Sequence, residues 1–345
     1  MSAIHQAAVV QLWPRRVAAP KPRLGFIGLG WIGRARMQAL IDAQVADVVA
    51  VADVDTNMAW EAAHESGAYA CASLDQLLQQ RLDGVVIATP NALHAAQAMV
   101  ALERGWAVFC QKPLARTAAE AAQVVASAHA HDCLLGVDFS YRCVSGVAAL
   151  REQVRAGELG DIYAIDLTFH NAYGPDKAWF YDVTQSGGGC VMDLGVHLID
   201  LAMWVTGRTH VEDLDAHLYQ HGRRLLPPIA TSEDYASVHY CLDDGACVRL
   251  TCSWRLPAGS DAVIEASFYG TRGGASLRNV DGSFYDFTVD RHDGTQRQRV
   301  AAPPDAWGGR ALVEWARKLA RDGRFDPEAR RMVDVAAIVD RIYGR

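Results

Sequence analysis

Short apolar runs alternate with segments of helical periodicity from Leu24 to about Ser140. Each apolar run has the length of a buried strand, and each periodic segment places its apolar residues on one helical face. Strands that are apolar throughout and joined by helices predict a parallel sheet covered on both faces. The predicted strands are LGFIGLG (24–30), DVVAVADVD (47–55), ACA (70–72), GVVIATP (84–90), WAVFCQKP (106–113) and LLGVDFS (134–140).

The pattern changes after about residue 141. A predicted helix (145–157) precedes DIYAIDLTFH (161–170), in which apolar residues recur at every second position, and a loop rich in glycine and aromatic residues follows. A second helix is predicted from about 190 to 206, and the stretch from Gly309 is predicted to be helical. Two hairpins are predicted between these helices: DYASVHYCL (234–242) with CVRLTCSW (247–254) around Asp244-Gly245, and AVIEASFYG (262–270) with GGASLRN (273–279).

These patterns divide the chain into an arm and two domains. We predict an N-terminal arm (1–22), a Rossmann domain with a doubly wound parallel sheet (23–140), and an α+β domain (141–345) with a large, mostly antiparallel open sheet. The length of 345 residues suffices for two domains of roughly 150 residues each.

Composition and charge exclude several classes of protein. The formal net charge of −7 gives no basic footprint for nucleic acid, and no uninterrupted apolar run reaches the ~20 residues of a membrane span. In the N-terminal arm the arginines follow the short apolar part, which is not the order of a signal peptide. The eight cysteines include no C-x-x-C pair and lie mostly in apolar runs, where free thiols are common. We therefore expect a cytoplasmic protein.

A glycine motif follows the first predicted strand. Gly28, Gly30 and Gly33 form G-x-G-x-x-G at the point where the strand ends and a helix begins. In this context the three glycines permit a tight turn, the approach of a pyrophosphate, and close packing of helix on strand. Asp53, twenty residues later, ends the second strand, where a carboxylate binds the ribose hydroxyls of NAD and repels the 2′-phosphate of NADP. The alternative is a structural glycine turn with a solvated Asp53.

Polar residues also end two later strands. The apolar run GVVIATP ends in Thr89-Pro90, followed by Asn91, at the sheet edge that lines the ligand crevice of such folds. Asn91 is equally suited to capping the next helix and to contacting the cofactor. Lys112 lies at the carboxyl end of the strand predicted at 106–113 and could stabilise an alkoxide as it forms, although a lysine at a strand end is by itself more often solvated.

The helix predicted at 190–206 carries candidate acid–base residues. Asp193 and His197 are four residues apart and therefore share one helix face, which Asp200 continues. Histidine is the side chain best suited to moving a proton at neutral pH, and a neighbouring carboxylate can orient it. A surface Asp–His pair is the plain alternative. A zinc site is not expected, because no third ligand lies at a recognisable spacing.

Together these motifs resemble the Gfo/Idh/MocA oxidoreductases, named for glucose–fructose oxidoreductase and inositol dehydrogenase. The resemblance runs from about Arg23 to the C-terminal helices and is carried by IGLGWIG (27–33), ATPNALH (88–94), Lys112-Pro113 and GGGCVMDLGVHLIDLAMWVTG (187–207). It implies that Lys112, Asp193 and His197 are catalytic. The implied cofactor contacts are Gly28, Gly30, Trp31, Ile32, Gly33, Asp53, Thr89, Pro90, Asn91, His94 and Gln111.

The sequence departs from the family at Gln111, where the family usually has glutamate, which changes the charge next to Lys112. Aromatic residues of the loop at 170–189 could line a sugar face beside the catalytic group. The expected substrate contacts are Lys112, Tyr173, Trp179, Tyr181, Asp193 and His197, with Phe180 and Lys177 nearby. The resemblance also implies a homodimer or homotetramer formed through the second domain's sheet.

The function expected from the resemblance is NAD-dependent oxidation of a secondary hydroxyl of a sugar, cyclitol or related polyol, or the reverse reduction. His197 would take the hydroxyl proton, Lys112 would stabilise the charge on oxygen, and Asp193 would position the substrate. Two alternatives stay open: an NAD-dependent glycosidase that oxidises its sugar transiently, and a non-catalytic NAD-binding regulator.

Overall fold

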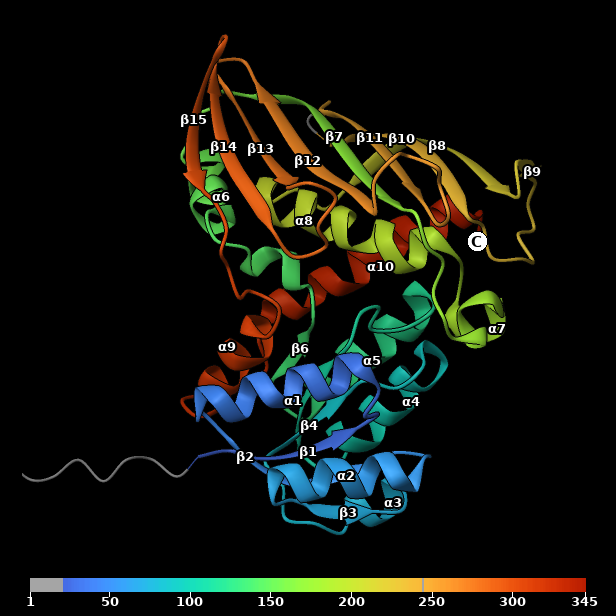
Figure 1. Ribbon diagram of the computed structural model, residues 1–345, viewed down its shortest axis with the longest axis vertical. Coiled ribbons are helices and arrows are strands. Elements are labelled where there is room, and N and C mark those ends of the chain that lie inside the picture. The colour runs from blue at the N-terminus through green and yellow to red at the C-terminus, as the bar shows by residue number, and fades with distance from the viewer. Residues whose placement is uncertain (1–20, 244) are drawn as a thin grey trace, which may run out of the picture.

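The computed structural model describes residues 21–243 and 245–345, so the predicted arm, apart from its last two residues, lies outside the described residues. The first sheet has six parallel strands in the order β3-β2-β1-β4-β5-β6, which confirms the predicted doubly wound domain (Figure 1). Its strands are β1 (Arg23–Ile27), β2 (Asp47–Ala52), β3 (Tyr69–Cys71), β4 (Gly84–Ile87), β5 (Ala107–Cys110) and β6 (Leu135–Val137). Its helices are α1 (Trp31–Ala43), α2 (Thr56–Ser66), α3 (Leu74–Leu77), α4 (Asn91–Leu102) and α5 (Ala118–Ala130).

Alternate residues of these strands enter two different cores. In β5, Ala107 and Phe109 pack with α1 and α2, whereas Val108 and Cys110 pack on the side of α4 and α5. Because side chains alternate across a strand, burial on both faces requires the continuous apolar runs seen in the sequence. The carboxyl end of β5 lies beside the second domain, because Lys112, two residues after the strand, pairs with Asp193.

The second sheet has nine strands in the order β15-β14-β13-β12-β7-β11-β10-β8-β9. Only the pair β7–β11 is parallel, so the predicted mostly antiparallel sheet and both predicted hairpins are confirmed. The strands are β7 (Ile162–Asn171), β8 (Val211–Gln220), β9 (Arg223–Leu225), β10 (Tyr235–Leu242), β11 (Cys247–Ser253), β12 (Ala262–Gly270), β13 (Gly274–Asn279), β14 (Phe287–Asp293) and β15 (Gln296–Ala301).

Helices cover one face of this sheet and lie between it and the first domain, while the other face points outward (Figure 1). Along β11, Val248, Leu250 and Cys252 are buried toward the helices, and Arg249 is exposed on the outer face. The helical elements of this domain are η1 (Ser140–Cys143), α6 (Val147–Arg155), η2 (Ala178–Tyr181), α7 (Val183–Ser186), a π-helical turn η3 (Val191–Gly195), α8 (Val196–Thr206), η4 (Pro327–Arg330) and α10 (Arg331–Tyr343). Of these, η3, α8 and α10 contact strands of the sheet.

Helix α9 (Arg310–Leu319) returns to the first domain although it lies near the end of the chain. Trp315 packs its ring on Phe109, with the ring centroids 5.6 Å apart. Gly84 and Gly136 make room for it, since a Cβ atom at either position would lie 3.0 Å or less from the Trp315 ring. The first sheet is therefore closed by a segment that follows the second domain in sequence.

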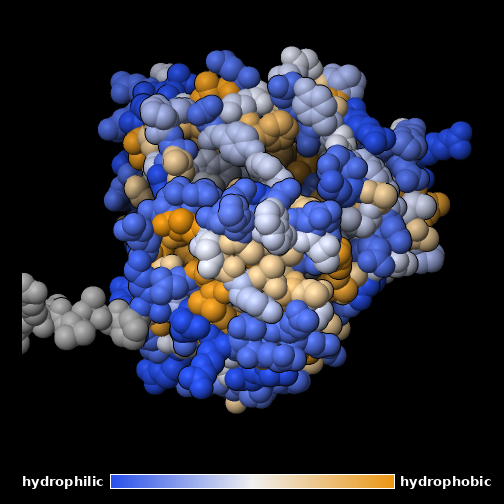
Figure 2. Space-filling view, turned by 60° about the horizontal axis from the view of Figure 1, so that its bottom comes forward, coloured by the Kyte–Doolittle hydropathy of each residue, from blue (hydrophilic) through white to orange (hydrophobic). Residues whose placement is uncertain are grey.

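The apolar segment Val183–Thr206 is, by length and composition alone, long and apolar enough to cross a membrane. However, 83% of that window is buried inside the fold, as expected for a core helix. Figure 2, which brings the lower part of the first domain forward, shows a mostly hydrophilic face on which apolar residues gather in small patches and in a hollow.

Candidate active site

The glycine motif forms the turn between β1 and α1. Gly28 has a φ of +87°, and a Cβ atom there would lie 2.4 Å from the carbonyl carbon of Ala88. A Cβ atom on Gly33 would lie 2.1 Å from the carbonyl oxygen of Gly28, whereas the space beside Gly30 is open. Within the described residues no side chain caps the start of helix α1, so its first amides point toward a site where an anion can bind. This cradle fits the pyrophosphate of a dinucleotide.

Asp53 lies beside this turn at the end of β2. Its Oδ2 accepts the Leu29 N–H at 2.6 Å and its Oδ1 accepts the Asp55 N–H at 2.9 Å. Each carboxylate oxygen keeps a further lone pair, so both can still accept hydrogen bonds from ribose hydroxyls. The neighbouring side chains Trp31 and Val54 are 69% and 99% exposed at this end of the candidate cofactor site.

The residues after β4 join two loops of the site. Helix α4 begins at Asn91 without a side-chain cap, and the Asn91 amide donates instead to the Ser186 carbonyl oxygen at 2.7 Å. Thr89 binds Gln97 through its hydroxyl at 2.7 Å. Both ring nitrogens of buried His94 lie 2.7 Å from backbone oxygens, those of Pro113 and Thr89. Asn91 and His94 therefore position the loops around the cofactor site.

Lys112 and Asp193 form an ion pair across the two domains. The Lys112 Nζ donates to Asp193 Oδ1 at 2.7 Å and to the Asp193 carbonyl oxygen at 2.8 Å. Trp254, directly after β11, donates from Nε1 to Asp193 Oδ2 at 3.1 Å. Both side chains of the ion pair are more than four-fifths buried. Asp193 is thus held between a lysine of the first domain and an indole of the second domain's sheet.

The predicted helix at 190–206 is helical, but its first part is a π-helical turn rather than an α-helix. Asp193 lies in that turn and His197 lies in the first turn of α8. Such π-turns are rare and occur mostly at functional sites. Gly195 lets this segment approach β11, because its Cβ position lies 3.3 Å from the Cys252 sulfur.

His197 lies beside the Lys112–Asp193 pair. Burial, with the nearby charges of Lys112 and Arg36, lowers the pKa of His197 well below its ordinary value of 6.5. The Tyr141 ring packs edge-on against the imidazole at 5.1 Å, and the buried Nδ1 has no hydrogen-bond partner in the described part of the chain. The imidazole is therefore neutral near pH 7 and able to accept a proton.

Gln111 binds a buried carboxylate behind Lys112. Its amide donates to Asp138 Oδ2 at 2.5 Å, and the same oxygen accepts from Arg36 Nε at 2.6 Å. Asp138 follows the carboxyl end of β6, and Arg36 lies on the buried side of α1. Asp138 therefore forms a buried ion pair with Arg36, whereas the carboxylate that contacts Lys112 itself is Asp193.

The aromatic loop packs against Trp254 at the mouth of the site. Tyr181 and Phe180 contact the Trp254 ring at centroid distances of 5.6 and 6.3 Å, and Trp179 stacks on Phe180 at 3.8 Å. Tyr173 lies farther out and donates its hydroxyl to Asp261 at 2.5 Å. Lys177 pairs with its neighbour Asp176 on the surface.

Asp200 does not continue the catalytic face of the helix. It is buried and accepts hydrogen bonds from both Nε and Nη2 of Arg142. A buried carboxylate needs such a partner, so Asp200 joins the helix to η1 and lies outside the catalytic group.

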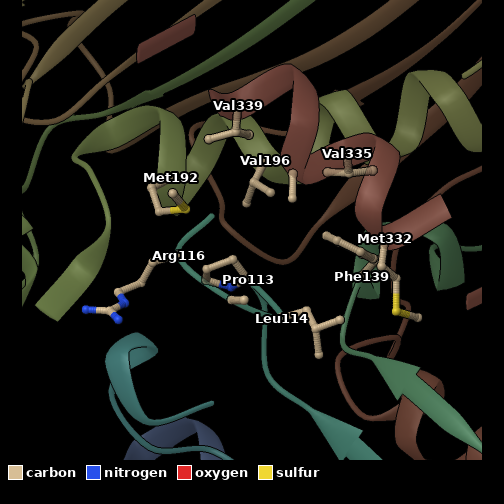
Figure 3. A pocket seen from close by; sticks show the side chains of 11 residues that line it. Pro113, Leu114, Arg116, Phe139, Met192, Val196, Met332, Val335 and Val339 are labelled. Atoms are coloured by element: carbon tan, nitrogen blue, oxygen red, sulfur yellow. The ribbon is translucent and has the colours of Figure 1, made fainter. Parts of the chain in front are cut away.

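The loop after Lys112 packs against the back of the catalytic helix. Figure 3 shows Pro113 and Leu114 of this loop facing Met192 and Val196, with residues of α10 closing the other side. The space between them is an apolar cavity of about 10 Å³, too small for a substrate. This packing fixes the backbone on both sides of the Lys112–Asp193 ion pair.

Three residues of the site, Asp138, Arg36 and Trp254, were not identified as functional from the sequence. Asp138 could have been found by the rule that identified Thr89 and Lys112, since it also follows the end of a parallel strand. Arg36 carried a weaker signal, a charged residue on the apolar side of the first helix. Trp254 was expected only as part of a strand face, because no local pattern links it to Asp193, which is 61 residues away.

Two family models match the chain. The model described as "Oxidoreductase family, NAD-binding Rossmann fold" matches residues 22–139, and the "GFO/IDH/MocA C-terminal domain" matches residues 147–276. Among solved structures, levoglucosan dehydrogenase in complex with NADH has a TM-score of 0.80 at 22% identity, covering 93% of this chain and 96% of that one. GenD2 from gentamicin A biosynthesis, in complex with NAD, has a TM-score of 0.78 at 24% identity, covering 97% and 98%. These structures show a shared fold.

Curated relatives are similar over different lengths. D-glucoside 3-dehydrogenase of Escherichia coli is 31% identical over a match that covers 58% of this chain and 60% of that protein. The rhizopine catabolism protein MocA of Rhizobium meliloti is 27% identical over 86% of this chain and 94% of its own length. Glucose-6-phosphate 3-dehydrogenase of Bacillus subtilis is 28% identical over 67% of each protein. With both domains matched by its models, the chain belongs to the Gfo/Idh/MocA family of oxidoreductases.

Proposed function

We propose that this protein is an NAD-dependent dehydrogenase that oxidises a secondary hydroxyl of a sugar, cyclitol or related polyol. The observation that carries the proposal is the Lys112–Asp193 ion pair beside neutral His197, formed between the two domains. Bound NAD would supply the hydride acceptor. The names of the relatives, among them two sugar 3-dehydrogenases, support a sugar as the substrate.

Each catalytic residue has a distinct part in this proposal. His197 accepts the hydroxyl proton, because its lowered pKa keeps the imidazole unprotonated near pH 7. Lys112 places a cation where negative charge develops on the substrate oxygen. Asp193, fixed by Lys112 and Trp254, orients the substrate through an adjacent hydroxyl.

A panel of sugars, sugar phosphates and polyols with NAD⁺ tests the proposal by the absorbance of reduced nicotinamide. We expect reduction with at least one sugar or polyol. Net hydrolysis of a glycoside without accumulation of NADH would overturn the proposal in favour of a glycosidase. Binding of NAD without turnover of any compound would favour a regulator.

NAD is expected to bind more tightly than NADP because the fixed carboxylate of Asp53 would face the 2′-phosphate. Asp53→Ser should narrow the ratio of the two dissociation constants by about tenfold or more, since like charges at close range repel strongly. Asp55→Ser is the matched control, because Asp55 caps α2 and serine retains the cap. Tighter binding of NADP to the wild type, measured by titration, would contradict this prediction.

We expect a homodimer or homotetramer formed through the outer face of the second sheet. That face carries polar side chains, and no helix of the described residues covers it; Arg249, for example, pairs with Asp166 across β11 and β7. Thr251→Arg places a cation in the middle of the face and should yield monomers, whereas Gln298→Arg on the edge strand β15 should not. Light scattering checks both variants, and a monomeric wild type at micromolar concentration would contradict the prediction.

A further inference from the structure

The first turn of the catalytic helix begins inside the protein, where its amide groups cannot reach water. The first N–H groups of a helix have no partner within it, and buried amides without partners are costly. Two residues bind all four amides from Gly189 to Met192. They are Glu233, two residues before the start of β10, and Tyr343, the last residue of α10.

Glu233 binds three of these amides. Its Oε2 accepts the Gly189 N–H at 2.9 Å, its Oε1 accepts the Val191 N–H at 2.8 Å, and its carbonyl oxygen accepts the Cys190 N–H at 3.0 Å. The Tyr343 hydroxyl accepts from Gly189 and from Met192, both at 3.2 Å, and donates to Glu233 Oε1 at 2.8 Å. We call this arrangement the Glu233–Tyr343 clamp.

The clamp explains two glycines of the triple-glycine motif. A Cβ atom on Gly188 would lie 2.1 Å from the Tyr343 hydroxyl, and one on Gly189 would lie 2.0 Å from the Glu233 carbonyl oxygen. Neither glycine has a positive φ, so close approach accounts for both. Glu233 is fully buried and Tyr343 is 3% exposed.

The clamp lies one residue from the catalytic carboxylate. The Asp193 N–H donates to the Gly189 carbonyl oxygen at 3.0 Å, so the clamped turn sets the position of the Asp193 backbone. That backbone matters because Lys112 binds the carbonyl oxygen of Asp193 as well as its side chain. A shift of this turn would therefore misplace Lys112 and Asp193 together.

We propose that Glu233 and Tyr343 are positioning residues that hold Asp193 and Lys112 in reactive geometry, and that ionised Glu233 is the form that does so. The proposal rests on the proposed dehydrogenase function for its kinetic consequences. Protonation of Glu233 removes the negative charge and turns one carboxylate oxygen into a hydroxyl, a weaker acceptor, so the hydrogen bonds from the Gly189 and Val191 amides weaken.

The protonation state of Glu233 should change near neutral pH. Burial raises the pKa of Glu233 to about 7, opposed by the hydrogen bonds from Val191, Tyr343 and Gly189. The titratable groups around it are Tyr343 on α10, Cys190 at the start of the catalytic helix, Cys252 on β11, and adjacent Asp234. Burial raises the pKa of Tyr343 and of Cys190 well above their ordinary values, so neither ionises near pH 7.

This assignment predicts an acid limb in the pH–activity profile, that is, a fall of activity toward low pH, that does not come from protonation of the general base His197. Activity of the wild type should fall as the pH drops through about 7, because Glu233 becomes protonated. His197 would lose its base form only at lower pH, since its pKa is lowered well below 6.5. An acid limb near pH 7 therefore belongs to the clamp.

The test compares the wild type with Glu233→Gln and Tyr343→Phe. Glu233→Gln should lower kcat by about tenfold at pH 8, change KM less, and lose the acid limb near pH 7. Tyr343→Phe should lower kcat by a smaller factor and keep the acid limb. Tyr240→Phe is the matched control, because the buried Tyr240 hydroxyl has no partner in the described residues and its loss should leave kcat unchanged.

Hydrogen exchange gives a readout that needs no turnover. The amides of 187–195 should exchange faster in Glu233→Gln, while the NAD dissociation constant stays at its wild-type value. Wild-type exchange together with an unchanged acid limb would overturn the proposal. If neither the wild type nor any variant oxidises a sugar, the proposed function fails. Faster exchange of the 187–195 amides in Glu233→Gln would still support the clamp in that case. If Glu233→Gln does not fold, a Tyr343→Phe variant with the kcat and the exchange rates of the wild type would overturn the proposal.

Discussion

Lys112→Ala is expected to lower kcat for the preferred substrate by about 10²–10³-fold at every pH, the size of effect typical for losing one group that stabilises an oxyanion. The variant removes the cation that we propose stabilises charge on the substrate oxygen, and among the described residues it leaves Asp193 with Trp254 as its one side-chain partner. Because the lost charge cannot be replaced by hydroxide, raising the pH should not restore the rate. A pH–rate profile with NAD⁺ at saturation measures this.

Lys318→Ala is the matched control for that variant, since Lys318 pairs with Asp326 near the end of α9. It should retain wild-type kcat. NAD affinity of Lys112→Ala should change little, because the glycine turn and Asp53 provide the cofactor contacts we expect. A Lys112→Ala protein that binds NAD and turns over at the wild-type rate would remove Lys112 from the mechanism.

His197→Ala is expected to lower turnover by about 10²–10⁴-fold near pH 7, the usual contribution of a general base. The loss should be partly recovered at high pH, where the substrate hydroxyl ionises more readily without a base. The two variants therefore differ in the shape of their pH profiles as well as in their rates.

His64→Ala is a suitable control for loss of an imidazole, because His64 stacks on exposed Trp60 on the surface of α2. It should leave the pH profile unchanged. Near-normal turnover in His197→Ala would contradict the assignment of the base, and Lys112 would become the leading candidate for proton transfer.

Local patterns in the sequence were enough to predict the fold and much of the candidate site. Buried parallel strands are short, apolar throughout and separated by helices, so the first sheet and its glycine turn could be predicted from 24–140. The hairpins β10–β11 and β12–β13 followed from strand runs around turn residues. The strands β8, β14 and β15 were not delimited, because β8 and β15 are rich in charged or polar residues and have no clear apolar alternation.

What the sequence could not predict depends on contacts between distant segments. Glu233 and Tyr343 reach Gly189 from 44 and 154 positions away, and neither lies in a recognisable motif. Gln111 was expected to change the charge next to Lys112, and its amide instead binds the buried carboxylate of Asp138, which follows the end of β6. The residues of the π-helical turn at 191–195 would also fit an α-helix, so the local pattern could not distinguish the two kinds of helix.

Transfer of a labelled hydride tests the central claim most directly. The sugar or polyol that gives the fastest turnover is prepared with deuterium on the carbon whose hydroxyl is oxidised, and the nicotinamide product is analysed by mass spectrometry. Direct hydride transfer from the substrate carbon to the nicotinamide predicts one deuterium in the reduced nicotinamide formed by the wild type. In Lys112→Ala and His197→Ala, the rate of labelling should fall in proportion to kcat. Reduced nicotinamide without deuterium, or labelling at wild-type rate in both variants, would contradict the account.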